Sequence, residues 1–231
     1  MIMDISLIDI VSLLATVTTL SLALTGLPIC KKIYDRGGTL DTSAFPFIAA
    51  TSSCILWLKY GIMKDDWTMI SVNAAGMIMQ SSYVIFYYSY CSNKQTLHKQ
   101  LLIASCLVFP LLFYTKYIVS DFYTALYQLG LACCTAGLIF CASPLEKMSH
   151  VIRTRSTDSM SFPLSFVTFL VSLEWWLYGY LVHDYFIQVP NCIGTFLTSV
   201  QLVLFIKYPS KRTGNHLSRS ASEPSINRAD V

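Results

Sequence analysis

The chain has 231 residues, of which 54% are hydrophobic and 13% are charged, with a formal net charge of +3. A soluble domain carries about 25% charged residues. Together with a mean hydropathy of +0.54, this composition excludes an ordinary soluble globule and indicates a polytopic membrane protein.

Seven apolar windows are long enough to cross a bilayer, for which about 20 residues are needed. The first is not a cleaved signal peptide, because it carries Asp4 and Asp9 in place of a basic leading region. The predicted spans are 6–29, 44–63, 69–90, 101–119, 122–142, 163–182 and 186–206.

The basic residues between these spans are distributed unequally. Thirteen of the 16 lysines and arginines follow the odd-numbered spans, whereas the other side has only Lys64 and Lys116, with Lys59 at the end of the second span. The positive-inside rule therefore predicts an N-terminus that is outside or lumenal and a cytosolic C-terminus. The plasma membrane and the Golgi or another internal membrane both remain open.

A Trp-x-x-Tyr-Gly motif occurs twice, as WLKYG at 57–61 and as WWLYG at 175–179, with an offset of 118 residues. The same offset relates Asn73 to Asn191, Gly76 to Gly194, and Tyr90 to Tyr208. The chain therefore contains a duplication of a three-helix unit. One additional span between the copies gives both the same orientation, so their symmetry axis should lie along the membrane normal.

The predicted fold is thus all-α, with seven transmembrane helices arranged as two parallel triple-helix bundles joined by a linker helix. The predicted boundaries are 1–97 for the first repeat, 98–120 for the linker, 121–209 for the second repeat and 210–231 for a tail. The tail is rich in serine, arginine and asparagine and lacks apolar periodicity, which predicts a disordered cytosolic segment.

Two tryptophans and two asparagines are expected at one depth in the membrane. Trp57 and Asn73 flank the turn between the second and third spans, and Trp175 and Asn191 flank the equivalent turn of the second repeat. An asparagine amide offers uncharged donors and an acceptor, and an indole face gives a flat apolar platform. The quartet predicts a binding site for a neutral polyhydroxylated solute. The alternative is an interfacial aromatic belt with asparagines that join helices.

Four prolines form a second repeated set near the cytosolic ends of the spans. A proline inside a helix removes a backbone hydrogen bond and permits a bend, so the set is a candidate hinge for an inner mouth. Its members are Pro28, Pro46, Pro144 and Pro163. The alternative for a single proline is a helix boundary, especially at positions 46 and 163.

Glu174 is the one acidic residue well inside a predicted span. An intramembrane carboxyl is a functional candidate by default, here a proton site. Its equivalent in the first repeat is Leu56, and a carboxyl that a neighbouring helix satisfies is the plainer interpretation.

Several motifs together resemble the SWEET (MtN3/saliva) family of sugar transporters over about residues 6–209. They are SPLEKMSHVIRTRSTDSMSFPLSF at 143–166, WWLYG, VPNCIG at 189–194 and, in the first half, LPICKKI, FPF, WLKYG and VNAAG. The overall length and the short tail resemble animal members.

The resemblance implies a uniporter that moves mono- and disaccharides in both directions by alternating access, without ATP. The family's asparagine pair falls on Asn73 and Asn191, its pocket walls on Trp57 and Trp175, and its proline tetrad on the four prolines above. Trp57 is bulkier than the small residue of some plant members. The pocket should therefore be narrower and favour a monosaccharide such as glucose over sucrose.

Three other classes of protein fit the sequence less well. A proton-coupled or PQ-loop-like carrier of another small solute shares the fold, but Pro28 and Pro144 are followed by Ile29 and Leu145 instead of glutamine. A seven-helix receptor would not normally show an internal duplication. An enzyme is not expected, because no histidines, cysteines or paired carboxylates recur at matched depth.

The expected partners are a sugar, the lipid bilayer, a second copy of the chain and a 14-3-3 protein. No cofactor and no nucleic acid is expected. The eight cysteines contain no paired CxxC motifs, which argues against a metal site and a disulfide framework.

The tail sequence RSASEP at 219–224 resembles a phosphoserine motif that 14-3-3 proteins bind through clustered basic residues. We expect phosphorylated Ser222 to support 14-3-3 capture, and Ser222→Ala to abolish it in a pull-down from phosphorylated protein. Ser220→Ala is the matched control, and capture that persists in Ser222→Ala would contradict the prediction.

Overall fold

The structure is a computed structural model that describes residues 6–39 and 42–208. The predicted disordered tail, including Ser222, lies outside these residues. Within them the secondary structure is helical and contains no strand.

Seven helical stretches of the described chain are long and apolar enough to cross a membrane. This finding confirms the predicted all-α fold with seven spans. In chain order the elements are α1 (Leu7–Ala23) with α2 (Gly26–Arg36), α3 (Phe45–Lys64), α4 (Trp67–Tyr90), α5 (Lys94–Phe113) with the π-helical turn η1 (Tyr114–Ile118), α6 (Phe122–Phe140) with α7 (Ala142–Thr154), α8 (Phe162–Leu181) and α9 (Tyr185–Lys207).

The first and fifth helical stretches continue beyond the apolar windows. They extend as α2 to Arg36 and as α7 to Thr154, through residues that are more polar than those of the apolar windows. Each continuation follows a break in the helix. At the first break the Leu27 N–H donates to the Leu24 carbonyl at 2.9 Å, the oxygen that an N–H at position 28 would otherwise use. Pro28 lacks that N–H, so the sequence itself sets the break.

Two short turns, at residues 65–66 and 182–184, form helical hairpins from α3 and α4 and from α8 and α9. Asp65 and His183 have positive φ angles of 55° and 53°. The next residues cap the following helices: Asp66 accepts from the Met69 N–H at 3.0 Å, and Asp184 accepts from the Phe186 N–H at 3.0 Å. Such an N-cap contributes about 1 kcal/mol, so these residues define where α4 and α9 begin.

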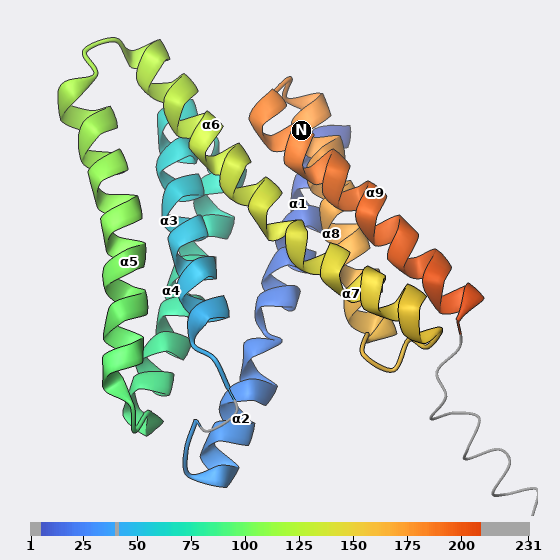
Figure 1. Cartoon of the computed structure of the whole chain (residues 1–231). Coiled ribbons are helices and arrows are strands. Elements are labelled where there is room, and N and C mark those ends of the chain that lie inside the picture. The colour runs from blue at the N-terminus through green and yellow to red at the C-terminus, as the bar shows by residue number, and fades with distance from the viewer. Residues whose placement is uncertain (1–5, 40–41, 209–231) are drawn as a thin grey trace, which may run out of the picture.

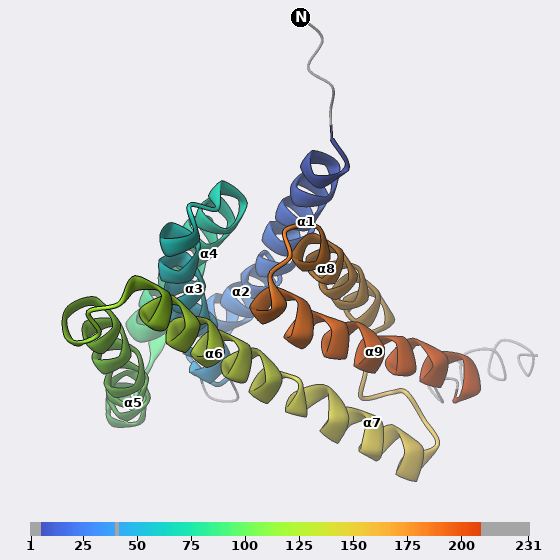
Figure 2. The ribbon, with the colours of Figure 1, turned by 90° about the horizontal axis from the view of Figure 1, so that it is seen from above.

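The helices pack as two related groups (Figure 1). In the first repeat α4 contacts α1, α2 and α3, and in the second α9 contacts α6, α7 and α8. The repeats meet where α1 packs on α8 and where α3 packs on α6. These two interfaces are equivalent under the duplication, because α1 corresponds to α6 and α3 to α8. Seen from above in Figure 2, α5 lies at the periphery, and it contacts α3.

One core joins both repeats at the end of the bundle that holds the two turns, which we call the hairpin end. This core draws buried residues from the first halves of α1, α4 and α9, from the middle of α6, and from the second halves of α3, α5 and α8. At the opposite end, called the loop end, the buried clusters are separate. Ile33, Ile48 and Tyr87 belong to one repeat, whereas Val151 and Leu204 belong to the other. The repeats are therefore tightly joined at the hairpin end only.

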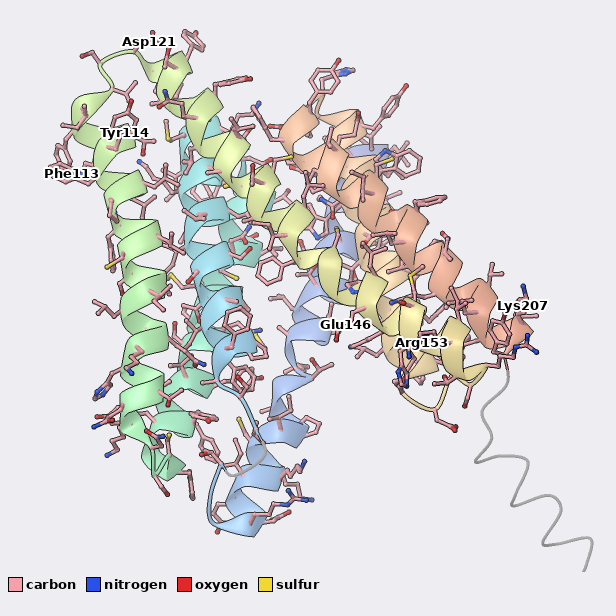
Figure 3. The ribbon with its side chains drawn as sticks, in the orientation of Figure 1. Phe113, Tyr114, Asp121, Glu146, Arg153 and Lys207 are labelled. Atoms are coloured by element: carbon pink, nitrogen blue, oxygen red, sulfur yellow. The ribbon has the colours of Figure 1, made fainter. Side chains whose placement is uncertain are left out.

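Charge also differs between the two ends. Figure 3 places Arg153 and Lys207 at the loop end, while Asp121 lies at the hairpin end beside the start of α6. The basic residues counted along the sequence thus include two that the fold brings to one end.

Close packing at the hairpin end depends on Gly179. A Cβ atom added there would lie 2.8 Å from the backbone nitrogen of Gln188, so we expect Gly179→Ala to lower the free energy of unfolding by about 1–3 kcal/mol. Thermal unfolding in detergent measures this change. Gly38→Ala is the control, because an added Cβ meets nothing within 4 Å; equal stability of the two variants would contradict the prediction.

Candidate solute-binding site

A cavity of about 320 Å³ lies between the two repeats, and all four residues of the predicted quartet line it: Trp57, Asn73, Trp175 and Asn191. Its volume is at the lower end of the range of small-molecule sites, about 300–1,000 Å³. The remaining wall combines small polar residues with apolar ones. They include Thr168, Ser172, Thr198, Met69, Ile187, Pro190 and Leu197.

The two asparagines have the same local geometry. Asn73 Nδ2 donates to the Met69 carbonyl at 2.9 Å, and Asn191 Nδ2 donates to the Ile187 carbonyl at 2.8 Å. Each bond goes back one turn along the residue's own helix and fixes the amide. Neither Oδ1 atom accepts a hydrogen bond from the described residues, so each amide keeps an acceptor and a second N–H for a solute.

The two tryptophans have the same ring contacts. Trp57 packs edge-on against Tyr60 with centroids 5.7 Å apart, and Trp175 packs edge-on against Tyr178 at 5.4 Å. The spacing of three residues places each pair on one helix face. The repeated Trp-x-x-Tyr-Gly motif is therefore a packing unit: the glycine allows the hairpin to close, and the tyrosine supports the indole.

The tyrosines of this motif also seal the hairpin end. Tyr60 donates from its hydroxyl to Asp184 of the other repeat at 2.7 Å, and Tyr178 donates to both carboxylate oxygens of Asp66 at 2.8 Å. Tyr178 is 118 residues beyond Tyr60, and Asp184 is 118 beyond Asp66. The tyrosine of each repeat thus donates a hydrogen bond to the aspartate of the other repeat. Lys64 adds an ion pair to Asp184 at 3.2 Å.

These bonds and the shared core close the cavity at the hairpin end. Asp184 is 3% exposed and Tyr60 2% exposed, so no solute passes between the repeats there in this conformation. The separate clusters of the loop end leave the repeats free of a common core on the other side.

Comparison with known proteins agrees with this geometry. The model of the family described as "Sugar efflux transporter for intercellular exchange" matches the chain twice, at residues 9–95 and 127–213, which is the offset of 118 found in the motifs. The chain belongs to the SWEET family. This match confirms the resemblance drawn from the motifs. It also confirms that the protein is an integral multi-pass membrane protein.

Relatives and a solved structure cover most of the chain. The sugar transporter SWEET1 of Drosophila pseudoobscura pseudoobscura is 34% identical over 88% of this chain and 90% of its own length. That of Rattus norvegicus is 36% identical over 84% and 88%. A solved eukaryotic SWEET transporter superposes with a TM-score of 0.80 at 28% identity, covering 88% of this chain and 99% of its own. These proteins are named as transporters, not as enzymes.

Glu174 lies beside this SWEET cavity and does not line it. Its Oε2 atom forms a hydrogen bond with Thr18 Oγ1 of α1, so the carboxyl joins the two repeats. No ion pair involves Glu174 in the part of the chain that the structure describes. This bond agrees with the plainer interpretation of the sequence, in which a neighbouring helix satisfies the carboxyl.

The four predicted hinge prolines occupy helix starts. Pro46 and Pro163 are the second residues of α3 and α8, and Pro28 and Pro144 are the third residues of α2 and α7. Pro144 lines the cavity, whereas the other three do not. At a helix start a missing N–H leaves no broken bond, so only Pro28 and Pro144, each after a helix break, stand where a bend already exists.

Sequence reasoning missed the four residues of the seal, Tyr60, Asp66, Tyr178 and Asp184, and the cavity residue Pro190. The signal was present for the seal, because both pairs recur at the offset of 118. What the sequence did not indicate is that each tyrosine binds the aspartate of the other repeat and not that of its own.

The seal should control access to the cavity. We expect the double change Tyr60→Phe and Tyr178→Phe to remove both Tyr–Asp bonds and open the hairpin end about tenfold or more often. Cys141 lines the cavity, so a variant with Cys141 as its only cysteine can be labelled by a membrane-impermeant thiol reagent. The reagent is added on the side that the hairpin end faces.

The control is Tyr87→Phe, which removes a tyrosine hydroxyl bonded to the Thr42 carbonyl at 2.8 Å, at the loop end. It should leave labelling of Cys141 from the hairpin side unchanged. Equal labelling of the double variant and the unmodified protein would contradict the assignment of the seal.

Proposed function

We propose that the protein is a facilitative, bidirectional sugar transporter, a uniporter that works by alternating access. The observation that carries this proposal is the cavity between the repeats, with paired asparagines and paired tryptophans at equivalent positions, sealed at one end by reciprocal Tyr–Asp bonds. Membership of the SWEET family and relatives named sugar transporters support it.

The chemistry of the cavity suits a neutral sugar. The free amide groups of Asn73 and Asn191 match hydroxyl donors and acceptors, and none of the described residues that line the wall is charged. The indole rings of Trp57 and Trp175 offer apolar faces for the C–H surface of a sugar ring. With two indoles in a cavity of about 320 Å³, glucose is favoured over sucrose.

Alternating access requires a second conformation in which the seal opens and the loop end closes. The charge distribution favours the hairpin end outside or in the lumen and the C-terminus in the cytosol. The structure, with its hairpin end sealed, would then be inward-facing, and the second conformation would be outward-facing. Closure of the loop end would bring the two separate clusters together. The breaks before Pro28 and Pro144 are the bends that we assign to this motion, with Pro46 and Pro163 at the adjoining helix starts.

The alternative function is proton-coupled carriage of a solute, and it rests on Glu174. That carboxyl lies within a span, joins the repeats through Thr18 and has no cationic partner in the described chain. An intramembrane carboxyl of this kind suits a proton relay. A transporter of this type would need a pH gradient, whereas a uniporter would not.

The deciding experiment is uptake of labelled glucose into proteoliposomes without an ion gradient. We expect the unmodified protein to equilibrate glucose, and Asn73→Ala and Asn191→Ala each to reduce initial uptake by about tenfold or more, because both amides contact the sugar in its bound state. Asn93→Ala, at the start of α5 and remote from the cavity, is the control.

Other outcomes separate the alternatives. Uptake that requires a pH gradient and is lost in Glu174→Gln would replace uniport by proton coupling. Sucrose flux equal to glucose flux would contradict the size argument. If no sugar is taken up either with or without a pH gradient, the cavity binds another solute or the protein is a receptor.

A further inference from the structure

The two cavity tryptophans are equivalent in the duplication but are held differently. Trp175 is 9% exposed, and its indole Nε1 donates to Thr19 Oγ1 of α1 at 2.8 Å. Trp57 is half-buried, and its Nε1 donates to no described residue. The one buried side-chain nitrogen or oxygen without a partner among the described residues is Gln128 Oε1. The Trp57 N–H is therefore not buried, and the Trp57 side chain lines the cavity.

The difference comes from the residue types. At the offset of 118 the equivalent of Thr19 is Gly137, and the unbroken helices α1 and α6 keep this register, because buried Ala15 corresponds to buried Cys133. The second repeat therefore has no hydroxyl at the position from which Thr19 holds Trp175. Thr135, two residues before Gly137, is exposed, and its hydroxyl donates to the Leu131 carbonyl of its own helix at 2.8 Å.

A neighbouring contact strengthens the same interface. Thr18, next to Thr19, bonds to Glu174, next to Trp175. The equivalent residues are Ala136 and Leu56, and in the described chain no side-chain hydrogen bond joins α3 to α6. The wall between α1 and α8 is therefore fixed by two polar contacts, whereas the equivalent wall is held by apolar packing alone.

We infer that Thr19 is a positioning residue for the sugar. It holds the Trp175 ring against the cavity and uses the indole N–H, so that Trp175 offers the sugar an apolar face only. Trp57, with its free N–H, is the indole that donates to a sugar hydroxyl. The pseudo-symmetric cavity then has one fixed wall and one hydrogen-bonding wall. This inference rests on the proposed function, because it takes a sugar as the solute.

Transport kinetics test the role of Thr19. Thr19→Val removes the acceptor with little change of shape, and we expect the half-saturation concentration for glucose to rise about fivefold, the factor that one net hydrogen bond gives. The maximal rate should stay within about twofold, and Thr19→Ser should restore the affinity. Thr135→Val, the same change at an exposed threonine of α6, should alter neither value.

A double-mutant cycle identifies the partner. In a Trp175→Phe background, Thr19→Val should have no further effect, whereas in a Trp57→Phe background its effect should persist. Equal effects of Thr19→Val and Thr135→Val, or a lower maximal rate at unchanged half-saturation, would overturn the inference.

A measurement without sugar keeps this inference separate from the proposed function. The chain has four tryptophans, so replacing Trp57, Trp67 and Trp176 with phenylalanine leaves Trp175 as the only indole. Thr19→Val should lower its fluorescence anisotropy in detergent, because the ring gains freedom, and Thr135→Val should not. If the anisotropy falls but the unmodified protein transports no sugar, the positioning role of Thr19 is supported and the proposed function fails. Unchanged anisotropy overturns the positioning role.

Discussion

The reciprocal bonding of two tyrosines to two aspartates is the constraint on which the arrangement of the repeats depends. Tyr60 binds Asp184 and Tyr178 binds Asp66, each across the boundary between the repeats. Each aspartate also caps the helix that it begins. Each carboxylate therefore both caps its own helix and accepts a hydrogen bond from the other repeat. The conformation of each turn is thus coupled to the packing of the two repeats.

This coupling explains why the core is shared at one end only. The hairpins bring the ends of α3 and α8 and the starts of α4 and α9 together, and the tyrosines carry their tryptophans into the same layer. Beyond the cavity the helices diverge, and each repeat buries its own cluster. A cavity between a joined end and a separated end is what an alternating-access carrier needs in one of its two states.

The departures from symmetry are as informative as the symmetry. Lys64 pairs with Asp184, but the equivalent residue, 118 positions later, is Val182. Glu174 faces α1, but its equivalent is Leu56. These two polar residues lack a polar equivalent, and they either pair with Asp184, as Lys64 does, or join α1 to α8, as Glu174 does. A duplicated fold has here become a molecule with two unequal walls around one cavity.

The number of spans, the duplication, and the common layer of Trp57, Asn73, Trp175 and Asn191 could be predicted from the amino-acid sequence. These features follow from apolar length, a fixed offset and helical rise, which are local or periodic properties. The family was indicated by the resemblance of the motifs. The helix ends were predicted less accurately, because α2 and α7 continue beyond the apolar windows.

Only the tertiary structure decided which residues meet across the repeats: Tyr60 with Asp184, Trp175 with Thr19, and Glu174 with Thr18. Each of these pairs is separated by more than 100 residues and joins helices of different repeats. Their contacts depend on how the helices rotate and cross when the core packs, and neither periodicity nor spacing along the chain encodes that rotation.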